Sequence, residues 1–129
     1  MAIGPATTLR ELWPLLVVAN IDQSLAFYRH VLGFELVGQA DAHGKLYWCR
    51  LKRQRCSLML QQGEAEDGSA VGRGRGVVLF FLCDDADALH AELTSRGMQL
   101  PQPQTAYYGM RQVELPDPDG YQLCFESET

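Results

Sequence analysis

The chain has 129 residues, a length typical of one domain, with 47% hydrophobic and 21% charged residues. This composition excludes a disordered chain, and no apolar run approaches the roughly 20 residues that cross a bilayer. The net charge of −5 disfavours nucleic acid as a partner. We expect a cytoplasmic protein with free thiols, because the first residues lack a signal-peptide pattern and the four cysteines form no CxxC pair.

The first half of the chain begins with an apolar run, Trp13–Ala19, that is long enough for one strand. Asn20 or Asp22 then caps a helix, because both side chains can accept a backbone N–H of the first turn. The apolar residues that follow fall on one helical face, and Gly33 supplies the left-handed residue that ends the helix. We expect three strands after it, near Phe34–Gln39, Lys45–Leu51 and Cys56–Gln62.

The same order returns 64 residues later. Val77–Cys83 is a second apolar run, Asp84 or Asp85 caps a helix over Ala86–Arg96, and Gly97 ends it. The strands expected in this half lie near Met98–Leu100, Met110–Leu115 and Tyr121–Glu126.

Two halves with one order of elements predict a tandem βαβββ repeat, an α+β chain with two mixed sheets. We expect one domain over residues 1–129, with module one at about 10–62, a flexible Gly-rich linker at 63–76 and module two at about 77–127. Neither half can cover its sheet alone, so the modules must face each other or another subunit.

Two motifs carry a resemblance to a known family. The helix that contains Phe27-Tyr28 and ends in Leu32-Gly33-Phe34, together with the turn Asp117-Pro118-Asp119-Gly120, resembles the vicinal oxygen chelate superfamily of glyoxalases, bleomycin resistance proteins and dioxygenases. The resemblance spans nearly the whole chain. It implies the glyoxalase/bleomycin resistance/dihydroxybiphenyl dioxygenase fold, in which curled sheets of paired modules form a cup.

The enzymes of this superfamily hold a divalent metal in the cup with four strand residues, usually His or Gln, Glu, His and Glu. The matching positions here are Trp13, Met59, Val77 or Val78, and Cys124. These side chains cannot replace imidazoles and carboxylates around a hard or borderline cation. A Cys–Met pair suits a soft ion such as Cu(I), but two buried core residues explain it better. We therefore expect no metal, no other cofactor and no catalytic residue.

Within the superfamily, this chain most resembles the members that lack the metal site. The bleomycin resistance proteins are among these members. That resemblance implies a homodimer that binds a small molecule without catalysis, sequestering an aromatic or cationic antibiotic in the cup. Two alternatives stay open: a divergent metal-dependent lyase or dioxygenase, and a protein-interaction module.

Aromatic and charged side chains near strand ends are the candidates for ligand binding. Aromatic rings can stack on a ligand, an arginine can hold an anionic group, and a glutamate can pair with a cation. The candidates are Trp13, Trp48, Phe81, Tyr107, Tyr108, Arg111 and Glu126. For each strand aromatic, packing in the core is the competing interpretation.

A basic run, Arg50-Leu51-Lys52-Arg53-Gln54-Arg55, places four positive charges within six residues. It falls at an expected hairpin, where a solvated turn is the usual explanation. A phosphate-binding or nucleic-acid-binding patch is the alternative.

Overall fold

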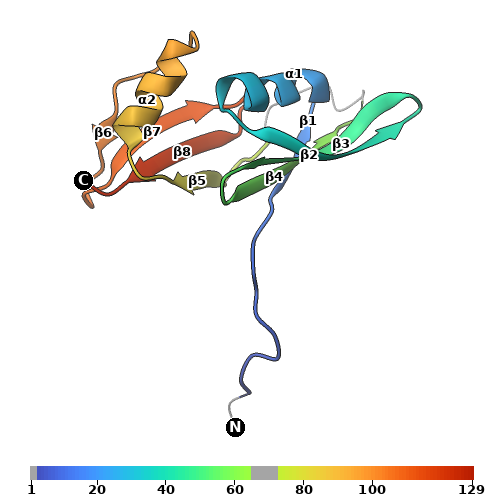
Figure 1. Ribbon diagram of the computed structural model, residues 1–129, viewed down its shortest axis with the longest axis horizontal. Coiled ribbons are helices and arrows are strands. Elements are labelled where there is room, and N and C mark those ends of the chain that lie inside the picture. Colours follow the sequence, from blue (N-terminus) through green and yellow to red (C-terminus); the bar gives the residue numbers. More distant parts are fainter. Residues whose placement is uncertain (1–2, 65–72) are drawn as a thin grey trace.

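The computed structural model describes residues 3–64 and 73–129, so most of the expected linker lies outside the described residues. Two four-stranded sheets stand side by side, with strand orders β1-β4-β3-β2 and β5-β8-β7-β6. In each sheet the two strands that come first and last along the chain pair in parallel, β1 with β4 and β5 with β8. The other strand pairs are antiparallel. Both helices lie on one side of the sheets, and the N-terminal segment projects from the other side (Figure 1). The expected α+β class with two mixed sheets is confirmed.

The first module follows the expected order of elements. Its elements are β1 (Leu15–Val18), α1 (Ile21–Ala26), a π-helical turn η1 (Phe27–Val31), β2 (Glu35–Ala42), β3 (Lys45–Arg53) and β4 (Cys56–Gln62). Asn20 is the N-cap, since its side chain accepts the Gln23 N–H at 3.1 Å. Gly33 adopts a φ of 74° after the turn, as the sequence predicts.

The second module repeats this order. Its elements are β5 (Val78–Leu82), α2 (Ala86–Ser95), β6 (Gln104–Thr105), β7 (Arg111–Pro116) and β8 (Gln122–Ser127). Asp85 is the N-cap of α2. The strand expected at Met98–Leu100 is wrong, because pairing with β7 begins only at Gln104. Pro101 and Pro103 lack the N–H that a ladder needs, and the apolar residues before them pack against the core instead.

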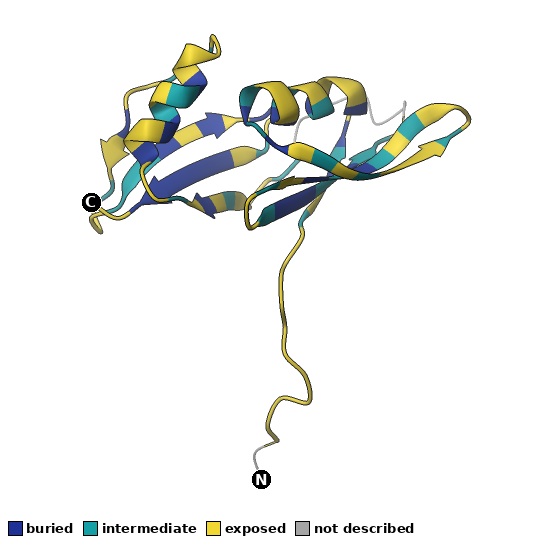
Figure 2. Ribbon diagram, viewed as in Figure 1, coloured by how far each residue is buried: buried dark blue, intermediate teal, exposed yellow. Residues whose placement is uncertain are grey.

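Side chains alternate between a helix-covered side and an outer side of each sheet. On β8, Leu123 and Phe125 lie in the core beneath the helices, whereas Cys124 and Glu126 point to the opposite side. Figure 2 shows the buried residues concentrated in the sheets and on the helix surfaces that face them. We call the side of each sheet opposite to its helix the outer face.

A row of aromatic rings joins the two modules inside the core. The ring of Phe34 contacts Tyr28 at a centroid distance of 5.9 Å and Phe81 at 6.1 Å, both edge-on. Phe81 in turn stacks on Phe125 at 4.7 Å. The row therefore runs from η1 of the first module to β8 of the second.

The two motifs of the family resemblance also meet at this junction. The Tyr28 hydroxyl donates to Asp117 at 2.8 Å, and the Ser24 hydroxyl donates to Asp119 at 3.2 Å. Asp119 also accepts the Ala19 N–H at 2.8 Å. Burial raises the pKa of Asp117, and burial beside Asp117 raises the pKa of Tyr28. The turn thus ties module two to the first helix.

Within the described residues no helix is long and apolar enough to cross a membrane.

Candidate functional site

The outer face of the second sheet exposes a row of large apolar side chains on β5. The row comprises Val78, Phe80 and Leu82, which are 48%, 52% and 73% exposed. Edge strands of soluble proteins normally carry polar or charged side chains on such a face. An exposed apolar row of this kind makes the face a candidate binding surface.

The strand register shows which side chains neighbour Met59 and Cys124, two of the positions that the sequence matches to metal ligands. Met59 pairs with Leu15, and Cys124 pairs with Phe80, so these are the neighbours on the outer faces. The expected first-strand positions lie earlier in the chain, since Trp13 precedes β1 and Val77 or Val78 precedes Phe80.

The outer-face side chains beside the expected metal positions also make a poor ligand set. Leu15 and Phe80 have no lone pair to donate, and burial raises the pKa of the Cys124 thiol to about 11, whereas a metal binds the thiolate. In residues 3–64 and 73–129 no group of three or more His, Cys, Asp or Glu side chains could hold a metal ion. The residues present do not fit the divalent metal of the family's enzymes.

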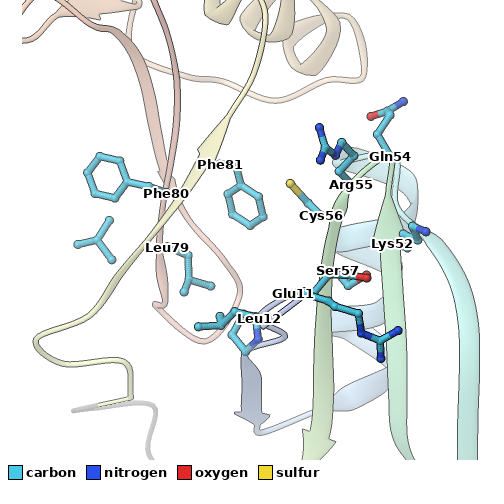
Figure 3. A pocket seen from close by; sticks show the side chains of 13 residues that line it. Glu11, Leu12, Lys52, Gln54, Arg55, Cys56, Ser57, Leu79, Phe80 and Phe81 are labelled. Carbon is cyan, nitrogen blue, oxygen red and sulfur yellow. The ribbon is translucent and has the colours of Figure 1, made fainter. Parts of the chain in front are cut away.

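A cavity of about 590 Å³ lies between the two modules, beside the segment that precedes β1. One wall, from the end of the β3–β4 hairpin, carries Lys52, Arg55 and Ser57. The opposite wall, from β5, carries Leu79 and Phe81, and Figure 3 shows their side chains directed toward the hairpin wall. The hairpin wall is polar and the β5 wall is apolar. Together with a volume of this size, they suit a small amphipathic organic molecule.

Two of the predicted ligand residues form a polar cluster on the outer face of the second sheet. The Tyr108 hydroxyl donates to a Glu126 carboxylate oxygen at 2.9 Å, and the Gln112 amide donates to the Tyr108 oxygen at 2.7 Å and to Glu126 at 3.3 Å. The hydrogen bond to Glu126 raises the pKa of Tyr108. Glu126 is 5% exposed, and in the described part of the chain no Lys, Arg or His nitrogen lies within 4 Å of its carboxylate.

The sequence analysis missed Gln112. It is the register partner of Glu126 on β7, so pairing β7 with β8 in the sequence would have placed the two side chains on one face.

The remaining predicted aromatic residues fall in different environments. Trp48 lies on the outer face of β3, where Gly38 of β2 leaves room for its ring. Trp13 is partly exposed and stacks on the guanidinium of Arg50. Tyr107 is fully exposed and contacts Tyr108 edge-on at 5.2 Å.

Phe81 and Arg111 lie on the helix-covered side of the second sheet. Phe81 belongs to the aromatic row of the core, although one edge of it lines the cavity. Arg111 donates to Asp87 of α2 at 3.1 Å and thus faces away from the Tyr108–Glu126 cluster. The structure therefore gathers Tyr108 and Glu126, and separates Arg111 from them.

The arrangement matches a known family. A model of the Glyoxalase/Bleomycin resistance protein/Dioxygenase superfamily matches residues 10–125. The chain belongs to this superfamily. None of the curated protein sequences matches it.

Solved structures of the superfamily share the fold. TnmS3, an antibiotic-binding protein from Streptomyces sp. CB03234, is 23% identical, with a TM-score of 0.70 over 95% of this chain and 100% of that one. A bleomycin-binding protein in complex with bleomycin is 24% identical, with a TM-score of 0.73 over 94% and 100%. The bleomycin resistance determinant of transposon Tn5 is 23% identical, with a TM-score of 0.76 over 93% and 98%. Identities this low establish the fold alone.

Proposed function

We propose that this superfamily member binds a small organic molecule non-covalently and stoichiometrically on its outer faces, without catalysing a reaction on it. The observation that carries the proposal is the set of outer-face side chains around the metal positions expected from the sequence, where Leu15, Met59 and Phe80 are apolar and Cys124 is a buried thiol. Similar structures that bind bleomycin or another antibiotic support the same class of function.

The ligand we propose carries aromatic rings and a cationic group, as an aromatic antibiotic does. Phe80 and Trp48 supply ring surface for stacking and apolar burial. Glu126 supplies a buried carboxylate whose hydrogen-bond partners, Tyr108 and Gln112, are both neutral. A buried charge without a counter-ion is costly, so a ligand cation that reaches Glu126 is favoured.

Fluorescence titration tests the proposal. Bleomycin and a panel of unrelated aromatic cations are added to the protein, and quenching of the two tryptophans is followed. We expect saturable quenching by at least one compound, and a smaller quenching amplitude in a Trp48→Phe variant. Unchanged emission across the panel, together with no heat of binding by calorimetry, contradicts the proposal.

We also propose that the protein acts as a homodimer. Each sheet leaves its outer face uncovered, and the segment before β1 projects away from the molecule with exposed apolar side chains (Figure 2). Those side chains are Ile3, Leu9 and Leu12. A second copy that covers this segment and the β5 row buries both apolar surfaces. Light scattering at micromolar concentration is expected to give twice the chain mass, and a monomer contradicts the proposal.

We place this action in the cytoplasm. All four cysteines are free, which fits a reducing compartment. Fractionation of the cells that produce the protein, with an antibody against the native chain, tests this assignment, and recovery outside the cytoplasmic fraction contradicts it.

A further inference from the structure

The structure divides the basic run at the β3–β4 hairpin between the two sides of the sheet. Arg53 points to the helix-covered side, where its guanidinium donates to Glu92 of α2 at 2.8 and 2.9 Å. Arg50 and Lys52 alternate with it and therefore point to the outer face. The fold uses the charge of Arg53 to join the modules, but it does not use that of Arg50 in this way.

The guanidinium of Arg50 is held on two sides. Its central carbon lies 4.2 Å from the centroid of the Trp13 ring, a cation–π contact. Its Nη1 donates to the buried Ser57 hydroxyl at 3.3 Å. Trp13 is itself fixed by its indole N–H, which donates to Glu11 at 3.0 Å. The guanidinium is therefore oriented before any ligand arrives.

Arg50 differs from the other partly buried arginines of the described residues. Arg53, Arg73 and Arg111 each have a carboxylate oxygen within 4 Å, from Glu92, Asp119 and Asp87 respectively. Across residues 3–64 and 73–129, Arg50 has no such carboxylate. An oriented, partly buried guanidinium keeps most of its five N–H donors for a group outside the chain.

We propose that Arg50, together with Ser57 and Lys52, forms an oxyanion-binding site, and that the ligand carries a carboxylate, sulfonate or phosphate group. Lys52 and Ser57 are register partners on the same outer face. A guanidinium binds a planar or tetrahedral oxyanion through two parallel N–H donors, which gives both affinity and orientation.

The cavity shows how the rest of such a ligand is accommodated. Lys52 and Ser57 line it on the hairpin side, while Leu79 and Phe81 form the opposite wall (Figure 3). Lys52 and Ser57 thus connect the guanidinium of Arg50, which does not itself line the cavity, with a space whose far wall is apolar. This inference rests on the proposed function, and it adds an anionic group to a ligand whose cationic group is recognised by Glu126 on the other sheet.

Two dyes that share one ring system separate the contribution of an anionic charge to binding from the contribution of the rings. Anilinonaphthalene sulfonate carries a sulfonate, and N-phenylnaphthylamine is the same ring system without it. We expect the wild-type protein to bind both and to bind the sulfonate about tenfold more tightly. In an Arg50→Gln variant this preference disappears while the affinity for the neutral dye stays the same. Arg29→Gln, which removes an exposed charge from η1, is the matched control and keeps the preference.

The outcomes distinguish this inference from the proposed function. If the preference for the sulfonate survives Arg50→Gln, or Arg29→Gln lowers it equally, the oxyanion site is wrong and the binding function stands. If neither dye binds the wild-type protein, the oxyanion site is wrong, and the proposed function is decided separately by the titration with bleomycin and aromatic cations.

A measurement on the wild-type protein keeps the test independent of how the variant folds. In a proton–nitrogen spectrum, the Nε–H signal of Arg50 is expected to shift saturably with added sodium sulfate, at a lower concentration than the signal of Arg29. Equal, unsaturated shifts of both signals overturn the inference.

Discussion

Polar groups have different partners on the helix-covered and outer sides of the same sheets. On the helix-covered side Tyr28 donates to Asp117, and Arg53 pairs with Glu92, so polar groups join the modules. On the outer side Arg50 and Glu126 contact neutral partners alone among the described residues. The residues that identify the family therefore hold the fold together. The residues that we propose to select a ligand lie on the opposite side and follow no motif.

The adjacent residues Phe80 and Phe81 test this division most strongly, because they face opposite sides of β5. Phe81→Ala removes a buried ring from the aromatic row and is expected to lower the free energy of unfolding by about 4 kcal/mol. Phe80→Ala is expected to lower it by less than about 1 kcal/mol, since the ring is half exposed, but to weaken ligand binding. Urea unfolding followed by circular dichroism measures both. Equal losses of stability contradict the division.

The Asp-Pro-Asp-Gly turn should matter for stability and not for ligand recognition. Asp117→Ala leaves the Tyr28 hydroxyl and the backbone N–H groups of Asp119 and Tyr121 without their acceptor. We expect a loss of about 3 kcal/mol in the free energy of unfolding. The exposed Asp41→Ala serves as the control. A large change in dye affinity of the folded Asp117→Ala variant, with unchanged stability, shows that the turn acts in binding instead.

Alkaline pH probes buried groups on both sides of the sheets through ionisation. Burial raises the pKa of Cys49 and of Cys124 to about 11, and burial raises the pKa of Tyr28 as well. Their neutral forms are favoured in the folded chain, so their contribution to stability is complete below the unfolded pKa values and is lost as pH rises through the folded ones. The free energy of unfolding should fall from about pH 9 upward. A Cys49→Ala/Cys124→Ala variant should show a shallower fall, and an unchanged slope contradicts the assignment.

Glu126 and Glu114 provide the smallest expected effect and a matched pair on one outer face. Glu126→Gln is expected to lower the affinity for an aromatic cation about tenfold, because the ligand loses a buried charged partner. Glu114→Gln, at an exposed position opposite Cys124, should leave the affinity unchanged. Calorimetric titration of both variants measures this difference. Equal losses indicate a general electrostatic attraction and not a site at Glu126.

The sequence predicts those features of the fold that short segments determine. The caps at Asn20 and Asp85 and the left-handed glycine at Gly33 depend on neighbouring residues, and each lies where the sequence placed it or among the alternatives it left open. The side on which Phe81 lies could not be predicted, because Val77–Cys83 is continuously apolar and has no period of two.

The candidate site was less predictable because it depends on contacts between distant segments. The basic run at the hairpin had two interpretations, and the contact of Arg50 with Trp13, across 37 positions of the chain, distinguishes Arg50 from the paired Arg53. The outer-face neighbours of Met59 and Cys124 required the register of β1 with β4 and of β5 with β8. Parallel pairing of this kind is a property of the tertiary fold and is not encoded in spacing from a helix cap.

Metal content tests the central claim most directly. Protein purified without chelator is analysed for zinc, nickel, iron, manganese and copper, and the account predicts far less than one equivalent of any of them per chain. It also predicts that dye binding is the same before and after treatment with a chelator. One tightly held equivalent of zinc, nickel or iron, whose removal abolishes binding or reveals a lost activity, would contradict the account and favour a metal-dependent enzyme.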